Sequence, residues 1–279
     1  MKIIEYFTEA KNPKAKNEDG LVITKDFIAV IDGSTSKSSQ RLSHCSSNGR
    51  YCMRIVSNYI RHTPTNITIE AFCRGVTAAV AKHYPKRKQE LYTTHPEERM
   101  AASVAIYSRL QRQIWLIGDC QCLIGKTAKQ HNATGFTFID NPKPYEAKLS
   151  NMRAEKIKAL LSTGEATEEE LLRHDIAREC IIPVMLEEMK NQNKNFSLID
   201  GFPIAVNKVK VVALDFEPWA VVLATDGYPK LFPTLAESEA ALEKQRKDDP
   251  LNIGFFRATK AFGVGLNSFD DRTYIRFEV

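Results

Sequence analysis

Three apolar runs that resemble β-strands each end close to an aspartate with a glycine beside it. These pairs are Asp32 with Gly33, Asp119 with Gly118, and Asp226 with Gly227. A glycine at such a position permits a tight turn and lets the backbone come close to a bound ion or phosphate. A single Asp-Gly turn is common after a strand, but three in one chain predict a shared site at the edge of a sheet.

The spacing of apolar residues predicts a chain that mixes strands and helices. Strands are expected at 3–7, 21–25, 27–31, 102–109, 113–117, 206–214, 219–225 and 273–279, and helices at 51–61, 69–83, 154–192 and 236–247. The fourth and fifth strands, and the sixth and seventh, are each expected to form a hairpin. Thr68 and Thr167 are predicted helix caps, and Pro183 is expected to kink or split the long helix.

Clusters of strands separated by helices favour an α+β fold with sheets inside and helices outside. The expected architecture is a four-layer α-β-β-α sandwich, in which helices flank two mostly antiparallel sheets. We expect one domain over residues 1–279, with a helical insertion at about 150–195. The chain is 43% hydrophobic and 26% charged, as is typical of folded soluble proteins.

Composition also limits where the protein acts and what it binds. No apolar run approaches the roughly 20 residues that span a bilayer, and the N-terminus does not resemble a signal peptide. The six cysteines are scattered, and the Cys120-Gln-Cys122 spacing does not match structural zinc sites, so reduced thiols are expected. The net charge of +5 is dispersed along the chain. We therefore expect a cytoplasmic monomer without a nucleic-acid or membrane partner.

Further carboxylates lie where they could join the three aspartates. Glu18 and Asp19 stand between the first two strands, and Asp270 and Asp271 precede the last strand. Clustered carboxylates repel one another unless divalent cations neutralise them. Ligands that are all oxygen favour Mg²⁺ or Mn²⁺, and a metal pair can hold a bridging hydroxide for in-line attack on phosphorus. The pattern therefore predicts a metal-dependent phosphoester hydrolase.

Five segments, in this order, resemble the motifs of the type 2C metal-dependent protein phosphatases. They are Asn17-Glu18-Asp19, Ala29-Val30-Ile31-Asp32-Gly33, Trp115-Leu116-Ile117-Gly118-Asp119, Leu223-Ala224-Thr225-Asp226-Gly227 and Ser268-Phe269-Asp270-Asp271-Arg272-Thr273. The resemblance covers nearly the whole chain, and five ordered motifs are more specific than one. It implies a Ser/Thr protein phosphatase, of a divergent bacterial-like kind, that uses two Mg²⁺ or Mn²⁺ ions.

The resemblance also implies a role for each matching residue. Asp32 would bridge both ions, Asp226 and Asp270 would hold the first, and Glu18 and the Gly33 carbonyl would hold the second. Asp19 would orient water ligands and Asp119 would serve a weaker third ion. Lys14 stands four residues before Glu18, where the family has a phosphate-binding arginine. Asp32, Asp19 and Lys14 are therefore the candidate catalytic residues.

This sequence departs from the family pattern in two further places. The family's Asp-Gly-His-Gly-Gly reads Asp32-Gly33-Ser34-Thr35-Ser36, which removes the histidine proposed as general acid. A Ser-Arg-Ala-Leu-Gly-Asp stretch is missing, and the predicted long helix occupies that interval. The polar run 34–39 is expected to be a solvated loop beside the site, where hydroxyls or Lys37 could contact a phosphate.

Two other functions remain open at this stage. The sequence Ile31-Asp32-Gly33-Ser34-Thr35 resembles the Asp-Gly-Thr element of inositol monophosphatase-like enzymes, which would imply a small phosphoester substrate. Alternatively, the loss of the family's arginine and histidine is compatible with a catalytically inactive, phosphatase-like binding module. Because every metal-ligand position is retained, the sequence favours the enzyme.

Overall fold

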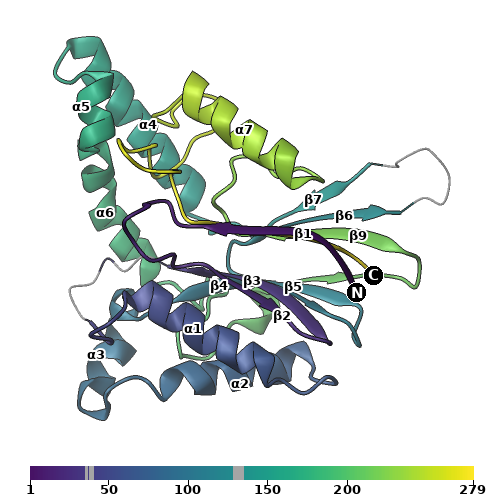
Figure 1. The fold of residues 1–279 in the computed structure, drawn as a ribbon. Coiled ribbons are helices and arrows are strands. Elements are labelled where there is room, and N and C mark those ends of the chain that lie inside the picture. Colours follow the sequence, from purple (N-terminus) through teal and green to yellow (C-terminus); the bar gives the residue numbers. More distant parts are fainter. Residues whose placement is uncertain (35–36, 38–40, 128–134) are drawn as a thin grey trace.

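A computed structural model describes residues 1–34, 37, 41–127 and 135–279 of the chain. Its strands form two five-stranded sheets, which lie face to face in Figure 1. One sheet has the order β1 (Lys2–Glu9), β10 (Arg272–Glu278), β9 (Trp219–Ala224), β6 (Gln121–Lys126) and β7 (Thr137–Ile139). The other has the order β2 (Gly20–Ile23), β3 (Phe27–Gly33), β4 (Ala102–Ser108), β5 (Gln113–Ile117) and β8 (Lys210–Ala213). Neighbouring strands are antiparallel in both sheets.

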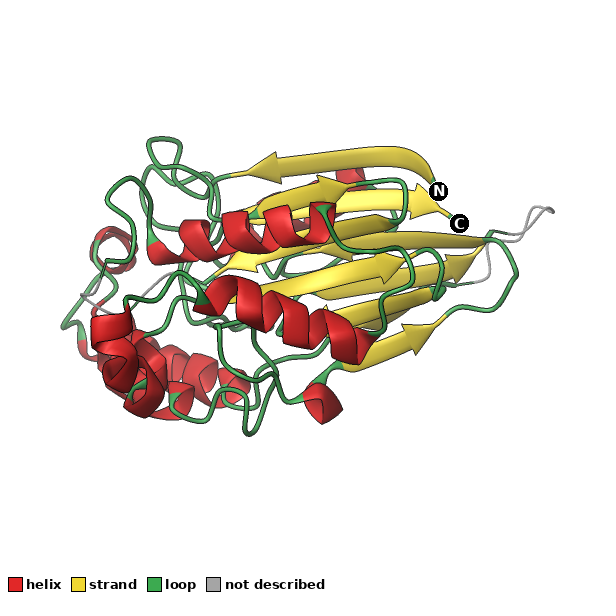
Figure 2. Ribbon diagram, turned by 90° about the horizontal axis from the view of Figure 1, so that it is seen from below, coloured by secondary structure: helices red, strands yellow, loops and turns green. Residues whose placement is uncertain are grey.

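Helices cover the outer faces of both sheets. In Figure 1, α1 (Asn48–Arg61) and α2 (Ile69–Ala81) lie on the β2–β8 sheet, and α7 (Leu235–Asp248) lies on the β1–β7 sheet. Figure 2, seen from below, shows α1 and α2 in front of the strands and running roughly along them. At the end away from the two termini stand α4 (Glu146–Thr163), α5 (Glu168–Arg173) and α6 (Ile176–Met189). The short α3 (Gln89–Thr94) and the 3-10 turns Lys86–Lys88, Pro96–Glu98 and Val206–Lys208 complete the helical segments. The predicted four-layer sandwich is confirmed.

The apolar run of β3 has no polar alternation because both of its faces are buried. Phe27, Ala29 and Ile31 pack in the core that α1 and α2 cover. Ile28 and Val30 point the other way, into the core between the two sheets. Continuous apolar runs are typical of strands that are covered on both faces.

Strand direction and register bring the three Asp-Gly turns to one end of the sandwich. Strands β3 and β5 both pair antiparallel with β4, so their carboxyl ends lie at the same edge of one sheet. In the other sheet Ala224, at the end of β9, pairs with Gln121, two residues after Asp119. The segments that follow β3, β5 and β9 therefore meet.

Several local predictions are confirmed and others are wrong. Thr68 and Thr167 cap α2 and α5, the latter in a full capping box. The expected 206–214/219–225 hairpin does not form, because β8 pairs with β5 in one sheet while β9 pairs with β6 and β10 in the other. The expected helix 154–192 is three helices, which begin at Glu146 and break after Gly164 and around His174. Pro183 does not split α6, in whose interior it lies.

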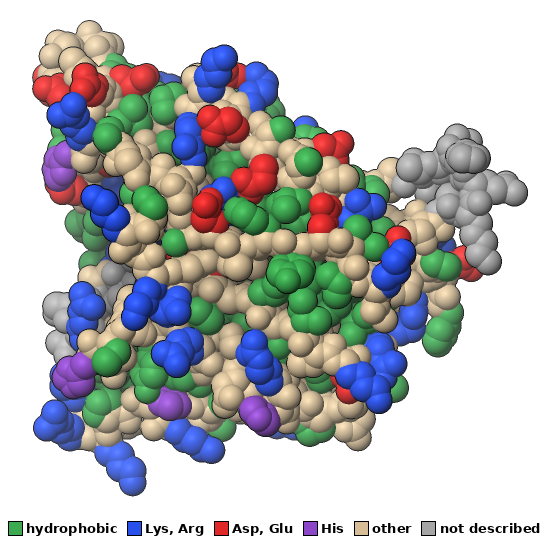
Figure 3. Space-filling model, in the orientation of Figure 1, with side chains coloured by type: hydrophobic (Ala, Val, Ile, Leu, Met, Phe, Trp, Pro, Cys, Tyr) green, Lys and Arg blue, Asp and Glu red, His purple; other side chains and the backbone are tan. Residues whose placement is uncertain are grey.

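Surface charge is unevenly distributed on the face that Figure 3 presents. Lys and Arg side chains gather over the α1–α2 half, and Asp and Glu side chains gather over the half that contains α5 and α7. Helix α1 alone carries Arg50, Arg54 and Arg61. None of the described helices is both long enough and apolar enough to cross a membrane.

Candidate metal centre

Three carboxylates meet where the strand ends converge. Asp32 lies near the end of β3, Asp119 follows β5 and Asp226 follows β9. One carboxylate oxygen from each lies within 4.8 Å of the other two. Asp119 is buried, while Asp32 and Asp226 are partly exposed. The structure therefore brings together the three aspartates that the sequence singled out.

The turn before Asp119 requires a glycine. Gly118 has a φ of +83°, in the left-handed region that L side chains rarely adopt. A Cβ atom on Gly118 would also lie 2.2 Å from the Ser103 Oγ. That hydroxyl donates a 2.6 Å hydrogen bond to the Asp119 Oδ1. The absence of a side chain at residue 118 thus lets Ser103 hold the Asp119 carboxylate in place.

The cluster is electrostatically strained without a cation. Burial, followed by the nearby charges of Asp19 and Asp119, raises the pKa of Asp32 to about 8. Burial also raises the pKa of Asp19 to about 8, with Asp271 and Asp226 adding to the effect. The pKa of Asp226 is raised for the same reason, by burial and by Asp32 and Asp119. Each shift means that the charged form is disfavoured where it stands.

Lysines supply positive charge to two of the carboxylates. Burial alone would raise the pKa of Asp119, but an ion pair with Lys143 and the hydrogen bond from Ser103 hold it below its usual value. Asp270 pairs with Lys11 through Oδ1 at 2.7 Å and with Lys260 through Oδ2. Burial and the neighbouring Lys11 lower the pKa of Lys260 to about 7.

Asp19 offers a test of whether the site suits a metal ion. Its side chain is 5% exposed, and Oδ2 accepts a 2.7 Å hydrogen bond from the Thr225 hydroxyl. Its Oδ1 is buried without a hydrogen-bond partner among the described residues. A buried carboxylate oxygen without a partner is costly, whereas it is a suitable ligand for a hard cation or for a water on one. The oxygen-only donor set and this orphaned atom fit Mg²⁺ or Mn²⁺.

Two further predicted ligands, Glu18 and Gly33, lie next to each other. Glu18 is buried, and the Gly33 backbone comes so close that a Cβ there would lie 2.5 Å from the Glu18 carbonyl oxygen. Asp271 has a different role, because its carboxylate accepts the backbone N–H groups of Lys11 at 2.9 Å and Glu18 at 2.6 Å. It ties the segment that carries Glu18 and Asp19 to the start of β10.

Lys14 does not lie among the carboxylates of the site. It is exposed, and its backbone N–H donates to the Asn12 side chain at 2.9 Å. Two cavities lie beside the carboxylates, and Lys14 is not among the described residues that line them. Of the polar run 34–39, only Ser34 and Lys37 belong to the described residues, and both line the smaller of these cavities.

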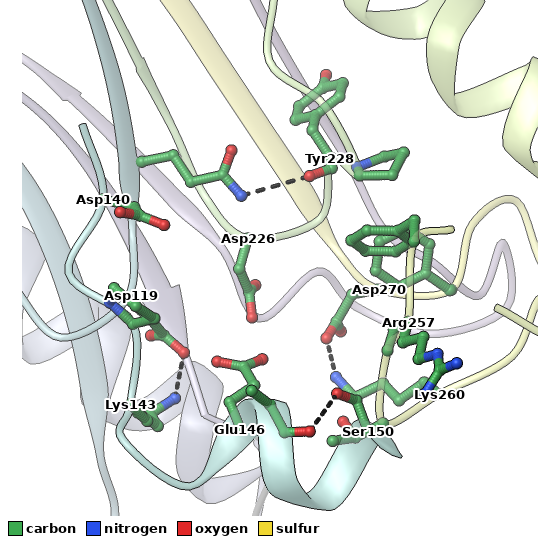
Figure 4. Close-up of a pocket in the computed structure, with 18 of the residues that line it drawn as sticks. Asp119, Asp140, Lys143, Glu146, Ser150, Asp226, Tyr228, Arg257, Lys260 and Asp270 are labelled. Carbon is green, nitrogen blue, oxygen red and sulfur yellow. Dashed lines mark hydrogen bonds and ion pairs between the residues drawn. The ribbon is translucent and has the colours of Figure 1, made fainter. Parts of the chain in front are cut away.

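Sequence reasoning missed several charged residues of the site, including Arg178, which lines a cavity beside the carboxylates. Figure 4 shows Lys143 reaching Asp119, Lys260 reaching Asp270, and the Glu146 carboxylate facing Asp226. Glu146 is the first residue of α4, and burial and Asp119 raise its pKa. Its position follows two prolines, Pro142 and Pro144, which could have indicated an earlier helix start. Lys143 and Lys260 lie in loops without any pattern that marks them.

Two connected cavities open onto the carboxylates. The smaller one, which we call the inner cavity, has a volume of about 90 Å³ and includes Asp32, Asp119, Asp226 and Asp270 in its wall. The larger one, the outer groove, has a volume of about 950 Å³. The two share Asp119, Asp226, Asp270 and the residues Lys143, Glu146, Thr259 and Lys260. The carboxylate cluster is thus accessible from a wide groove.

Comparison with known proteins finds no matching family model and no matching curated protein. The chain is similar to several solved structures. One is the catalytic domain of the serine threonine protein phosphatase PstP in complex with two manganese ions, at 12% identity and a TM-score of 0.47, covering 99% of this chain and 97% of that one. Another is the serine/threonine phosphatase Stp1 from Staphylococcus aureus, at 14% identity and a TM-score of 0.44, with coverages of 98% and 92%. A third is the PPM Ser-Thr phosphatase MsPP from Mycobacterium smegmatis in complex with cacodylate, at 14% identity and a TM-score of 0.42, with coverages of 99% and 98%.

Proposed function

We propose that this protein is a metal-dependent phosphomonoester hydrolase that removes phosphate from phosphoserine or phosphothreonine in proteins. The observation that carries the proposal is the convergence of Asp32, Asp119 and Asp226, with one oxygen of each within 4.8 Å of the others. Three carboxylates this close repel one another, and the Asp19 Oδ1 is buried without a hydrogen-bond partner among the described residues. Such a group of oxygen ligands is suited to bind divalent cations.

The roles proposed for the residues follow the sequence motifs. Asp32 would contact both of two Mg²⁺ or Mn²⁺ ions, with Asp226 and Asp270 on the first, and Glu18 and the Gly33 carbonyl on the second. Asp19 would orient bound water, and Asp119 would serve a third ion. When bound, such ions supply the charge that lowers the pKa of a water nucleophile and screens the phosphoryl oxygens. The protein itself would hold these ligands in place through the strand ends, which bring Asp32, Asp119 and Asp226 together.

The shape of the outer groove favours a protein substrate over a small phosphoester. A volume of about 950 Å³ is far larger than a phosphate needs, and the wall includes Phe138, Phe255 and Phe256. Phe255 is fully exposed, and Phe138 is about half exposed. Exposed aromatic side chains next to a site can pack against the residues that flank a phosphoserine.

The proposal includes a single domain and a monomeric protein in the cytoplasm. All six cysteines lie in the described part of the chain and are free thiols. Free thiols are what a reducing compartment favours. Helices α4 to α6, which follow β7 and precede β8, are proposed as an insertion that shapes substrate binding.

A substrate panel tests the proposal and separates its alternatives. Phosphoserine and phosphothreonine peptides, sugar phosphates and inositol monophosphate are compared at equal concentration with Mn²⁺, and phosphate release is measured. We expect release from the phosphopeptides to be fastest. Faster release from inositol or sugar phosphates would instead assign a small-molecule phosphatase. Peptide binding without any release would assign an inactive binding module.

A further inference from the structure

The Lys260 side chain lies in the wall of both the inner cavity and the outer groove. It forms an ion pair with Asp270, and Figure 4 shows this pair at the edge of the carboxylate cluster. The side chain is 24% exposed, so it is neither a surface lysine nor a fully buried one. Any role for Lys260 toward a substrate rests on the proposed function.

Two arginines from the helical insertion hold the backbone that carries Lys260. Arg153 of α4 is completely buried and donates to the carbonyl of Ala258 at 3.0 Å. Arg178 of α6 donates to the carbonyl of Thr259. Consecutive residues before Lys260 are therefore fixed from two helices, and arginine is well suited to such carbonyl contacts.

Further contacts complete this support. The Arg153 guanidinium also pairs with Asp175 at 2.7 Å, and it donates to the Leu251 carbonyl at 2.8 Å. The fully buried Asn252 donates its side-chain amide to the Lys260 carbonyl at 3.0 Å. Buried and satisfied polar contacts of this kind rigidify the segment that they hold. The position of Lys260 is thus set by the fold and not by its ion pair alone.

Five carboxylates and four cationic side chains are among the described residues that line the inner cavity. Lys37, Lys143, Arg178 and Lys260 all line it, and they come from four different segments. Once divalent cations neutralise the carboxylates, the four basic side chains would repel one another unless a negative charge enters the cavity as compensation. A phosphate dianion supplies that compensation, through charge-assisted hydrogen bonds.

We propose that Lys260, held by Arg153 and Arg178, contacts the phosphoryl oxygens of the substrate in the inner cavity. It would do the work that the motif order assigns to Lys14, which is exposed and lies outside the described cavity wall. A divalent cation held by Asp270 would replace Lys260 as the partner of that carboxylate, and the Lys260 ammonium would then be available to the substrate. The helical insertion thereby positions a group for phosphate recognition, through Arg153 and Arg178.

Lys11 provides a matched control. It pairs with the same carboxylate, Asp270, at 2.7 Å, and its side chain has the same 24% exposure as that of Lys260. Among the described residues that line the inner cavity and the outer groove, Lys11 is not present. Replacing either lysine removes a counter-ion of Asp270, but only the Lys260 variant would remove a contact with phosphate.

The test measures the affinity of inorganic phosphate for the Mn²⁺-loaded protein by calorimetry in Lys260→Met, Lys260→Arg, Lys11→Met and Lys14→Ala. Lys260→Met should weaken phosphate binding by about tenfold, as expected for the loss of one charged hydrogen bond. Lys260→Arg should retain most of the affinity. Lys11→Met and Lys14→Ala should each change it by less than about twofold. Mn²⁺ affinity and circular dichroism are recorded for every variant, so that loss of metal or of folding is recognised.

Equal effects of Lys260→Met and Lys11→Met on phosphate would overturn the inference, because Lys260 would then be only a counter-ion of Asp270. A change in Mn²⁺ affinity with unchanged phosphate affinity would lead to the same conclusion. Loss of phosphate affinity in Lys14→Ala alone would return the role to Lys14. Failure of the proposed function looks different, since the wild-type protein would then release no phosphate from peptides. Because calorimetry does not require turnover, the Lys260 result can be read in either case.

Discussion

Asp32 lies near two other carboxylates, Asp19 and Asp119, and this proximity together with burial raises its pKa to about 8. It is also one of the three aspartates whose oxygens come within 4.8 Å of one another. The charged form of such a side chain is destabilised when no cation is present and stabilised when a cation binds. Its charge should therefore affect both activity and stability.

The first prediction concerns Asp32→Asn. The amide keeps the shape of the side chain but not its charge, so it can no longer neutralise two cations, and kcat for phosphopeptide hydrolysis should fall at least about 100-fold. In the metal-free protein the melting temperature should be unchanged or higher, because one member of a repelling cluster is gone. Asp248→Asn, on the exposed face of α7, is the control and should alter neither. More than a tenth of the wild-type rate at saturating Mn²⁺ would refute the assigned role.

The second prediction is the pH dependence of stability without metal. Asp19 and Asp32 have a pKa of about 8 in the folded state, whereas aspartate in an unfolded chain titrates near 3.9. Between about pH 4 and pH 8 these two groups therefore bind more protons in the folded state, so the stability that they contribute is full below about pH 4 and is lost as pH rises toward 8. Thermal unfolding of protein in EDTA should show a melting temperature that falls by at least about 2 °C between pH 5 and 7.

Saturating Mn²⁺ should reverse the sign of this dependence. Metal ligands must be deprotonated, so binding of the ions tightens as pH rises and stabilises the folded state further.

In EDTA, the window from pH 5 to 7 lies at or below the pKa of Lys260, which is about 7. The change in stability across this window is therefore set mainly by the carboxylates. A melting temperature that rises with pH in EDTA would contradict this arrangement of charges.

Among the structural elements, the end of β5 shows how local backbone geometry serves the site. Gly118→Ala should destabilise the protein for two reasons, namely its φ of +83° and a Cβ contact of 2.2 Å with Ser103. Gly164, which ends α4, has a similar φ of +71°, but no atom lies within 4 Å of the position that a Cβ would take. Gly164→Ala should cost only about 1 kcal/mol of unfolding free energy, and Gly118→Ala about 1–3 kcal/mol more. Urea denaturation compares them, and equal costs would show that the Ser103 contact is unimportant.

The elements that the sequence predicted well are those whose pattern is local. Strand β3 and helices α1 and α2 were predicted within a few residues, because apolar spacing and the Thr68 cap specify them without reference to the rest of the chain. The predicted hairpin of β8 and β9 failed for a different reason. Nothing in two adjacent apolar runs reveals that they join different sheets. That choice depends on partners far away in sequence, as in the pairing of Trp115 with Val211 and of Ala224 with Tyr274.

The same distinction holds for the site residues. The aspartates at 32, 119 and 226 could be predicted because each follows a strand and has a glycine neighbour. Lys143 and Lys260 could not, because their loops have no periodicity and their positions depend on tertiary contacts. For Lys260 those contacts are made by Arg153 and Arg178, whose helices were predicted with the wrong boundaries. The sequence thus predicts the negatively charged residues of the site, but it does not predict the lysines that compensate their charge.

In the molecule as a whole, the ends of β3, β5 and β9 lie at one end of the sandwich and the two termini lie toward the other (Figure 1). The carboxylates come from segments that span nearly the whole chain, from Glu18 to Asp270. The antiparallel sheets bring these segments together, and α4 to α6 close the same end. Such a site can form only when both sheets are complete, so metal binding should report on the folded state of the entire domain.

Phosphate release from a phosphoserine peptide, followed while Mn²⁺ is added to protein stripped with EDTA, tests the central claim most directly. The account predicts no release in EDTA, activity that returns as Mn²⁺ is added, and saturation once the carboxylate cluster is filled. Release that persists in EDTA, or a complete absence of release at saturating Mn²⁺ in folded protein, would contradict it.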